Sequence, residues 1–177
     1  MKRVYRLLYI PFILFILSSC TSVKYFIVRH AEKATPSDGI AMSTPNDPPL
    51  SAAGKVRAIE LREELKDRNV QYIYSTNTIR TISTAQPLNE LRGATTIELY
   101  NTRDSLDFLI IKLKEVKKGN SLIVGHSNTV DDIVNKLCGE KKVPADLPDS
   151  EYDNLYIVTK KGKKFKFENK TYGTPTN

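Results

Sequence analysis

The chain has 177 residues, of which 40% are hydrophobic and 27% charged, a composition that predicts one globular domain and excludes an intrinsically disordered chain. The formal net charge is +7. Lys2, Arg3 and Arg6 lie in an N-terminal segment that we expect to be removed, and +7 less these three charges leaves +4. This mild basic excess suits an anionic substrate or surface and does not by itself indicate nucleic-acid binding.

The first twenty residues read as a targeting segment. A basic start is followed by an apolar run over residues 7–17, which ends in the sequence LSSC. Eleven apolar residues are short for a membrane span, which needs about 20, and the pattern is typical of a secretory signal. The LSSC end resembles a bacterial lipobox, which implies a signal peptide over residues 1–19 and lipidation of Cys20. An uncleaved signal anchor over residues 7–23 is the alternative.

The two cysteines agree with this interpretation. If Cys20 carries acyl chains, Cys138 has no partner in the chain, so no intrachain disulfide is expected. Cys138 ends a helical pattern and is most simply a small apolar residue. We therefore expect the mature protein to be lipid-anchored in the cell envelope, on the periplasmic side or on the outer surface.

Residues 20–177 are expected to form a single domain with its core over about 23–168, since no internal repeat is visible. Short apolar stretches rich in β-branched and aromatic residues alternate with amphipathic ones. The strands predicted in this way are 23–28, 71–74, 95–100 and 121–125, followed by a hairpin over 155–169 that turns at Lys161-Gly162. The predicted helices are one capped by Ser51 and those over 75–91, 105–119 and 128–138, with Pro87 as a kink or an early break.

This alternation predicts an α/β fold. We expect a three-layer sandwich with a mainly parallel sheet, helices on both faces and a C-terminal hairpin. Residues 34–50 hold four prolines and form a long loop, and long loops in compact domains are often functional. In open sheets of this class, ligands bind at the carboxyl ends of the strands.

Both histidines of the chain lie at that edge of the predicted sheet. His30 follows the strand 23–28 and His126 follows the strand 121–125. Arg29 precedes His30, and Arg80 lies in the helix after the second strand, so we expect the four side chains to converge. Arginine forks fit phosphate oxygens, and helix N-termini add N–H donors. The site is therefore predicted to bind an anion.

A neutral imidazole in such a site can act as a nucleophile, and the second ring can be a phosphate ligand or a proton carrier. A single histidine at a strand end is usually no more than a polar residue with a satisfied backbone bond, but two at one sheet edge favour chemistry. Two histidines beside arginines make a poor cation site, because the guanidinium groups repel a metal. We expect no metal and no other cofactor.

These residues fall into motifs that resemble those of the histidine phosphatase superfamily, the phosphoglycerate-mutase-like fold. The similar segments are VRHAEK, LSAAG, IYSTNTIRTISTAQPL and LIVGHSNTV, which occur in the family order over most of residues 23–159. The resemblance implies that His30 attacks phosphorus, that Arg29, Arg80 and His126 hold the phosphoryl oxygens, and that water hydrolyses the phosphohistidine. Ala31 departs from the glycine that is commoner at the third position of the signature.

The sequence does not single out one residue that protonates the leaving oxygen. The resemblance points to an acid after the third strand, where this chain has Asp104, but Asp104 is equally suited to be the N-cap of the next helix. Glu98, Glu32 and Asp131 remain alternatives.

The lysine-rich run KKGKKFKF at 160–167 alternates lysine with phenylalanine. This pattern predicts a half-buried edge strand whose lysines prevent further strand pairing. Contact with anionic lipid headgroups is a second interpretation for a tethered protein, and no nucleic-acid partner is expected.

Together these features predict a membrane-tethered phosphatase that acts outside the cytoplasm on a small phosphorylated substrate. No obligate protein partner is inferred. A phosphohistidine-protein phosphatase and a non-catalytic anion-binding lipoprotein are the alternatives.

Overall fold

The computed structural model describes residues 22–39, 46–101 and 106–176. Cys20 and Asp104, for which the sequence predicts roles, lie outside these residues, as does the whole proposed signal peptide.

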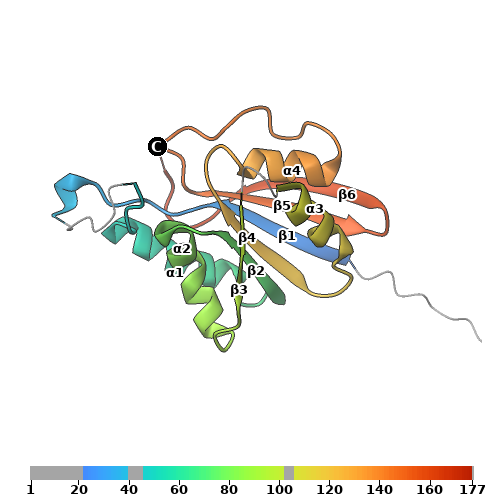
Figure 1. The fold of residues 1–177 in the computed structure, drawn as a ribbon, viewed down its shortest axis with the longest axis horizontal. Helices are drawn as coiled ribbons and strands as arrows, with labels where there is room; N and C mark the ends of the chain where they lie inside the picture. The colour runs from blue at the N-terminus through green and yellow to red at the C-terminus, as the bar shows by residue number, and fades with distance from the viewer. Residues whose placement is uncertain (1–21, 40–45, 102–105, 177) are drawn as a thin grey trace, which may run out of the picture.

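A six-stranded sheet forms the centre of the described fold, in the order β3-β2-β4-β1-β5-β6 (Figure 1). The pairs β3–β2, β2–β4 and β4–β1 are parallel. The strand β5 runs antiparallel to β1 and forms an antiparallel hairpin with β6. The strands are β1 (Ser22–Arg29), β2 (Val70–Thr76), β3 (Ile97–Tyr100), β4 (Asn120–Gly125), β5 (Asn154–Lys161) and β6 (Lys164–Thr171).

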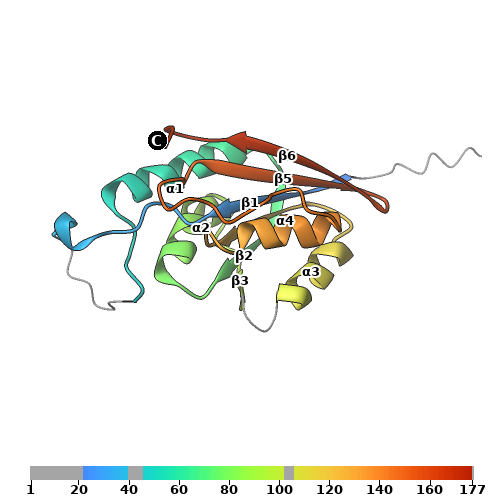
Figure 2. The ribbon, with the colours of Figure 1, turned by 90° about the horizontal axis from the view of Figure 1, so that it is seen from above.

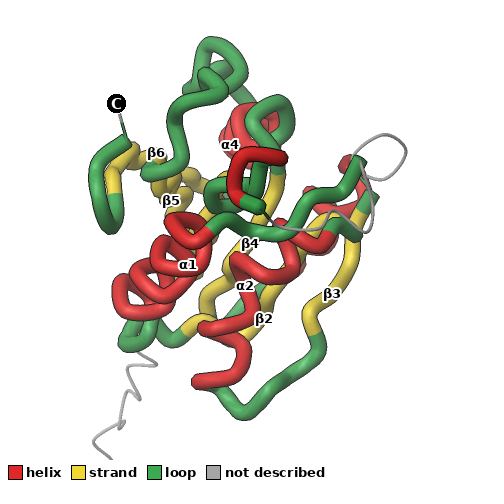
Figure 3. The backbone as a smooth tube through the Cα atoms, turned by 90° about the vertical axis from the view of Figure 1, so that its left-hand side faces the viewer, coloured by secondary structure: helices red, strands yellow, loops and turns green. Residues whose placement is uncertain are grey.

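Two pairs of helices pack against this sheet, and a short 3-10 helix, η1 (Pro36–Asp38), lies in the loop after β1. α1 (Ala52–Leu65) and α2 (Ile79–Leu91) contact each other on one face, as Figure 3 shows. α3 (Leu106–Glu115) and α4 (Val130–Cys138) pack on the other face. The predicted three-layer α/β fold is thus confirmed. Within the described ranges no helix has the length and apolar character that a membrane crossing requires.

The apolar run of β1 fills both cores. Tyr25 and Ile27 belong to the core cluster that also contains residues of α3 and α4, whereas Phe26 and Val28 belong to the cluster with residues of α1 and α2. All four side chains are at most 2% exposed. Because successive side chains of a strand point to opposite faces, a strand covered on both faces needs a continuous apolar sequence. Burying each of these side chains contributes about 1.5–3 kcal/mol.

The structure differs from the sequence predictions at some boundaries. Of the two effects expected for Pro87, a kink or an early break, the early break does not occur, because α2 continues to Leu91, the predicted end of this helix. A proline removes one helical hydrogen bond, and here Ala85 and Leu88, on either side of it, are buried in the core and hold the helix on the sheet. The third strand begins at Ile97 rather than at residue 95.

The C-terminal hairpin has the predicted character. β6 is the outermost strand, with Phe165 and Phe167 packed against the core and Lys164 and Lys166 exposed. The edge-strand interpretation of the lysine run is therefore confirmed. The turn contains Gly162, whose φ of +60° lies in the left-handed region that favours glycine.

Candidate active site

Strand pairing brings both histidines to the same edge of the sheet. Arg29, the last residue of β1, is the register partner of Gly125 at the end of β4, and the N–H of His30 donates to the Gly125 carbonyl oxygen at 2.9 Å. His126 follows immediately. A side chain at position 125 would not fit, since a Cβ there would lie 2.8 Å from Thr129 Oγ1. The parallel pairing of β1 with β4 thus sets the separation of the two rings.

His30 is held in one tautomer and kept neutral. Its Nδ1 lies 2.8 Å from the carbonyl oxygen of Ala31, an acceptor, so the ring places its proton on Nδ1 and leaves a lone pair on Nε2. Burial lowers the pKa of His30 to about 3; the bond to Ala31 acts in the opposite direction, and the positive charges of Arg80 and Arg29 and the His126 ring add to the lowering. The residue as a whole is 4% exposed. An uncharged imidazole is the form that can attack phosphorus.

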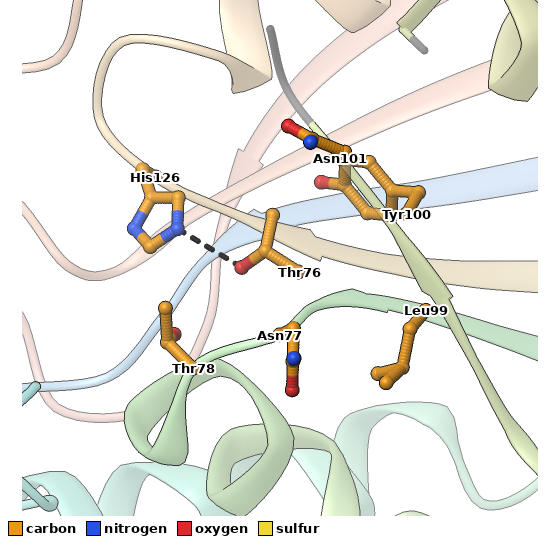
Figure 4. Close-up of a pocket in the computed structure, with 7 residues that line it drawn as sticks. All are labelled: Thr76, Asn77, Thr78, Leu99, Tyr100, Asn101 and His126. Carbon is orange, nitrogen blue, oxygen red and sulfur yellow. Dashed lines mark hydrogen bonds between the residues drawn. The ribbon is translucent and has the colours of Figure 1, made fainter. Parts of the chain in front are cut away.

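His126 faces His30 edge-on, with the ring centroids 5.4 Å apart and the ring planes at 69°. Its Nε2 lies 2.9 Å from Thr76 Oγ1 (Figure 4), and the Thr76 hydroxyl in turn donates to Thr81 Oγ1 at 3.0 Å. Because the Thr76 hydroxyl proton is already donated to Thr81, the bond between Thr76 and His126 must be donated by the Nε2–H of His126. The Nδ1 atom of His126 is then free to accept a hydrogen bond from a ligand or to take up a second proton. Burial, followed by the charges of Arg80 and Arg29, lowers the pKa of His126 to about 4.

The guanidinium of Arg29 is bound to the loop between α4 and β5. One terminal nitrogen donates to the carbonyl oxygens of Pro148, Asp149 and Glu151 at 2.8, 3.2 and 3.0 Å. The guanidinium carbon lies 4.2 Å from the centroid of the Tyr152 ring, a cation–π distance. Arg29 therefore holds this loop over the end of β1, a structural role that the sequence did not reveal.

Replacing Arg29 with methionine should lower the free energy of unfolding by about 2–4 kcal/mol, because three carbonyl oxygens lose a charged donor. Urea denaturation followed by circular dichroism measures the change. Arg80→Met is the matched control, since the partner of Arg80 remains partly in contact with water; its cost should be clearly smaller. Equal costs for the two variants would contradict the structural role of Arg29.

Arg80 is oriented by a carboxylate from the long loop. Its terminal nitrogen lies 3.0 Å from Asp47 Oδ1, and the same carboxylate accepts the Ile79 N–H at the start of α2 at 2.9–3.1 Å. Asp47 is not among the residues lining the cavity in front of Arg80. It therefore acts from behind as a positioning residue. No sequence pattern links it to Arg80, and the only signal was an acid in a loop predicted to be functional.

Asp47→Ala should lower kcat/KM for a phosphomonoester about tenfold, because Arg80 loses a charge-assisted hydrogen bond that fixes its orientation. Asp47→Asn keeps one acceptor oxygen and should retain most of the activity. The inhibition constant of inorganic phosphate should rise with Asp47→Ala, and the melting temperature should fall by only about 2–4 °C, because the Ile79 N–H loses its acceptor. Asp132, an exposed acid on α4, provides the control variant Asp132→Ala. If both alanine variants behave alike, Asp47 has no positioning role.

The four predicted residues open into one cavity of about 770 Å³. Lys33 adds a further positive charge to the cavity wall, and the Nε atoms of Arg29 and Arg80 are buried without a hydrogen-bond partner among the described residues. His126 also lines a second cavity, shown in Figure 4, with residues of β2 and β3. The lining of the first cavity is Arg29, His30, Lys33, Ala34, Thr35, Pro36, Asn46, Pro48, Arg80, His126, Ser127, Asn128 and Asp149.

Two of the candidate proton donors are engaged elsewhere. Glu32 accepts from Arg57, whose Nε lies 2.8 and 2.9 Å from its two oxygens, and this pair attaches α1 to the end of β1. Glu98 pairs with Lys112 on the surface. Neither acid lines the histidine cavity.

Asp131 is 8% exposed on α4, where burial raises the pKa of its carboxyl, but it is not part of the cavity wall either. Asp104 lies outside the described residues. Among the residues that the structure describes in the cavity wall, Asp149 is the one acid. Its side chain is 95% exposed and lies 3.4 Å from Arg29. Sequence reasoning missed Asp149, because nothing in the pattern returns residue 149 to the end of β1.

Within the described ranges there is no group of three or more histidine, cysteine, aspartate or glutamate side chains that could hold a metal ion. The chemistry of the cavity is that of an anion site, with two arginines and a lysine around two neutral imidazoles.

Comparisons with known proteins agree with this geometry. A family model described as "Histidine phosphatase superfamily (branch 1)" matches residues 25–108, a range that holds Arg29, His30 and Arg80 and ends before β4 and His126. A search of curated proteins found no match.

The fold is shared with solved structures of low sequence identity. SixA from Agrobacterium tumefaciens is 19% identical, with a TM-score of 0.60 over 86% of this chain and 98% of that one. The protein histidine phosphatase SixA complexed with tungstate is 16% identical, with a TM-score of 0.60 and coverages of 84% and 96%. A mutant phosphoserine phosphatase from Entamoeba histolytica, complexed with phosphoserine, is 13% identical, with a TM-score of 0.61 and coverages of 86% and 97%.

The matched range contains Arg29, His30 and Arg80, and the sheet brings His126 to the same cavity. The chain thus matches the model of the histidine phosphatase superfamily over residues 25–108 and shares the fold of these solved structures.

Proposed function

We propose that the protein is a phosphatase that hydrolyses a phosphomonoester through a covalent phosphohistidine on His30. The observation that carries the proposal is the state of the His30 ring. It is neutral, its Nδ1–H is fixed on the Ala31 carbonyl, and its Nε2 shares a cavity with Arg29, Arg80 and His126. A ring with only a structural role would not require three positive or protonatable neighbours around its free nitrogen.

The proposed reaction has two displacements at phosphorus. Nε2 of His30 forms a bond to phosphorus while the bond to the leaving oxygen breaks, and that oxygen takes up a proton. A water molecule then attacks the phosphorus, the N–P bond breaks, and inorganic phosphate leaves. Arg29, Arg80 and a protonated His126 stabilise the negative charge on the three transferring oxygens.

A phosphohistidine-protein phosphatase is the second candidate, and one observation favours it. In the described part of the cavity wall the only carboxylate is the exposed Asp149. Imidazole is a better leaving group than an alkoxide and needs less help from an acid, so a site poor in acids suits an N–P bond. A relative of the same fold is a protein histidine phosphatase.

Trapping the intermediate tests the main proposal. Incubation with a ³²P-labelled phosphomonoester and rapid denaturation should leave one label per chain that is stable in alkali and labile in acid, as expected of an N–P bond. His30→Ala should carry no label. A wild-type protein that binds phosphate yet neither labels nor turns over would be the non-catalytic binding protein.

A series of aryl and alkyl phosphates separates the two substrate classes. Asp104→Asn should slow alkyl phosphates far more than p-nitrophenyl phosphate if Asp104 is the proton donor. If Asp104→Asn slows both kinds of substrate to the same extent, another acid protonates the leaving oxygen. A strong preference for a phosphohistidine peptide over every ester would favour the second candidate.

We further propose that lipidated Cys20 tethers the phosphatase to a membrane outside the cytoplasm. The support is the LSSC sequence and the short apolar run before it. Globomycin, which blocks lipoprotein signal peptidase, should make a larger precursor accumulate, and Cys20→Ala should abolish labelling with a fatty-acid analogue. An unchanged mobility with globomycin would contradict the tether.

A further inference from the structure

The end of the domain opposite the candidate active site is rich in lysine. The chain enters β1 at Ser22, and β5, which runs the other way, brings Lys161 into register with Ser22. The segment between α3 and β4 ends at the same side, because β4 is parallel to β1. Figures 1 and 2 both place the β5–β6 turn beside the start of β1.

Five exposed side chains from two chain segments make up this lysine face, which we define as Lys117, Lys118, Lys161, Lys163 and Lys164. Among the described residues, Lys118, Lys161, Lys163 and Lys164 form no ion pair; the paired lysines are Lys66, Lys112, Lys136, Lys142 and Lys166. Unpaired charges keep their full attraction for an external partner.

The two segments are joined by Lys160. Its ammonium donates to the carbonyl oxygens of Lys114 and Val116, just before Lys117, so the β5–β6 turn is fixed against the end of α3. These hydrogen bonds hold the lysines of the two segments near one another, although their like charges repel. A cluster of lysines is expected where the negative charge of a bound surface offsets the repulsion between the ammonium groups.

We propose that the lysine face binds anionic phospholipid headgroups. The position of the face indicates this partner. The strand β1 begins two residues after Cys20, so the proposed lipid tether would leave the domain at this end and hold the lysine face near the membrane. Each lysine near an anionic bilayer adds to the attraction, and this electrostatic contribution supplements the acyl chains. The attraction requires no recognition of a particular headgroup, only negative charge at the surface.

The test uses the untethered chain of residues 22–177, which contains all the described strands, helices and core clusters. Its fold is checked by circular dichroism and by activity on p-nitrophenyl phosphate. Sedimentation with vesicles of phosphatidylcholine containing about 30% phosphatidylglycerol should show binding at low ionic strength that is lost near 1 M salt, where the Debye length is about 3 Å. Pure phosphatidylcholine vesicles should not bind.

The double variant Lys161→Gln/Lys163→Gln should weaken binding to the anionic vesicles about tenfold and leave phosphatase activity unchanged. Lys55→Gln/Lys170→Gln removes the same charge at the other end of the domain and should bind like the wild type. Equal weakening by both double variants, or no binding by the wild type at low salt, would overturn the proposal. If single-stranded RNA binds as tightly as the anionic vesicles, and this binding also depends on Lys161, the partner of the lysine face is nucleic acid and not lipid.

Discussion

His30→Ala is expected to lower kcat/KM for p-nitrophenyl phosphate by at least about 10³-fold, because the covalent route through Nε2 is lost. The nitrophenolate leaves with little help from an acid, so the measurement reports on the nucleophile rather than on the unassigned proton donor. The neutral state of the ring adds a second expectation. Since the pKa of His30 is lowered to about 3, protonation of the nucleophile should not limit kcat/KM until the pH falls far below 5.

Folding of the variant needs a separate check, because His30 is buried. His30→Gln retains a donor for the Ala31 carbonyl and serves as the second variant. If either variant folds and keeps the wild-type rate, His30 is not the nucleophile.

His126→Ala should lower kcat for the same substrate by about 10²–10³-fold, because a charge-stabilising donor is removed from the transferring phosphoryl group. Thr76→Val removes the hydroxyl that accepts from Nε2 but leaves the ring in place, and its effect should be smaller. A larger loss with Thr76→Val than with His126→Ala would contradict a direct role for the ring.

The lowered pKa of His126 makes anion binding depend on pH. The free ring is neutral above about pH 4, and a bound oxyanion raises its pKa, so binding takes up a proton in the interval between the two values. Inhibition by tungstate should therefore strengthen as the pH falls from about 7 to about 5. The pH dependence should be weaker in His126→Ala, because only His30 then remains to take up a proton. An identical dependence in both proteins would show that His126 stays neutral in the complex.

The fold and the placement of the main site residues followed from local patterns. The apolar runs that end in Arg29-His30 and in Gly125-His126 predict two buried strands, and parallel pairing then brings both ends to one edge. This reasoning works because the parallel arrangement converts strand ends into neighbours whatever lies between them in the sequence. The motif resemblance, and not the periodicity, supplied the roles of the residues.

The partners of the site residues could not be predicted in the same way. Arg29 bonds to carbonyl oxygens 119 to 122 positions away, and backbone carbonyls have no sequence signature. Asp47 and Arg80 are 33 positions apart across a loop whose path is set by packing. Pro87 suggested a kink or an early break, yet α2 continues to Leu91, because the core contacts of Ala85 and Leu88 outweigh the loss of one hydrogen bond.

The direction of β1 has a consequence for which molecules the proposed active site can reach. The strand begins at the end that the proposed tether would hold near the bilayer and finishes at Arg29, just before the nucleophile. Eight residues of extended chain span roughly 26 Å. A domain standing on its lysine face would therefore carry its catalytic opening on the far side, pointing away from the supporting membrane. The phosphates of that bilayer would lie out of reach, and we expect the substrates to be solutes of the surrounding compartment or groups on a facing surface.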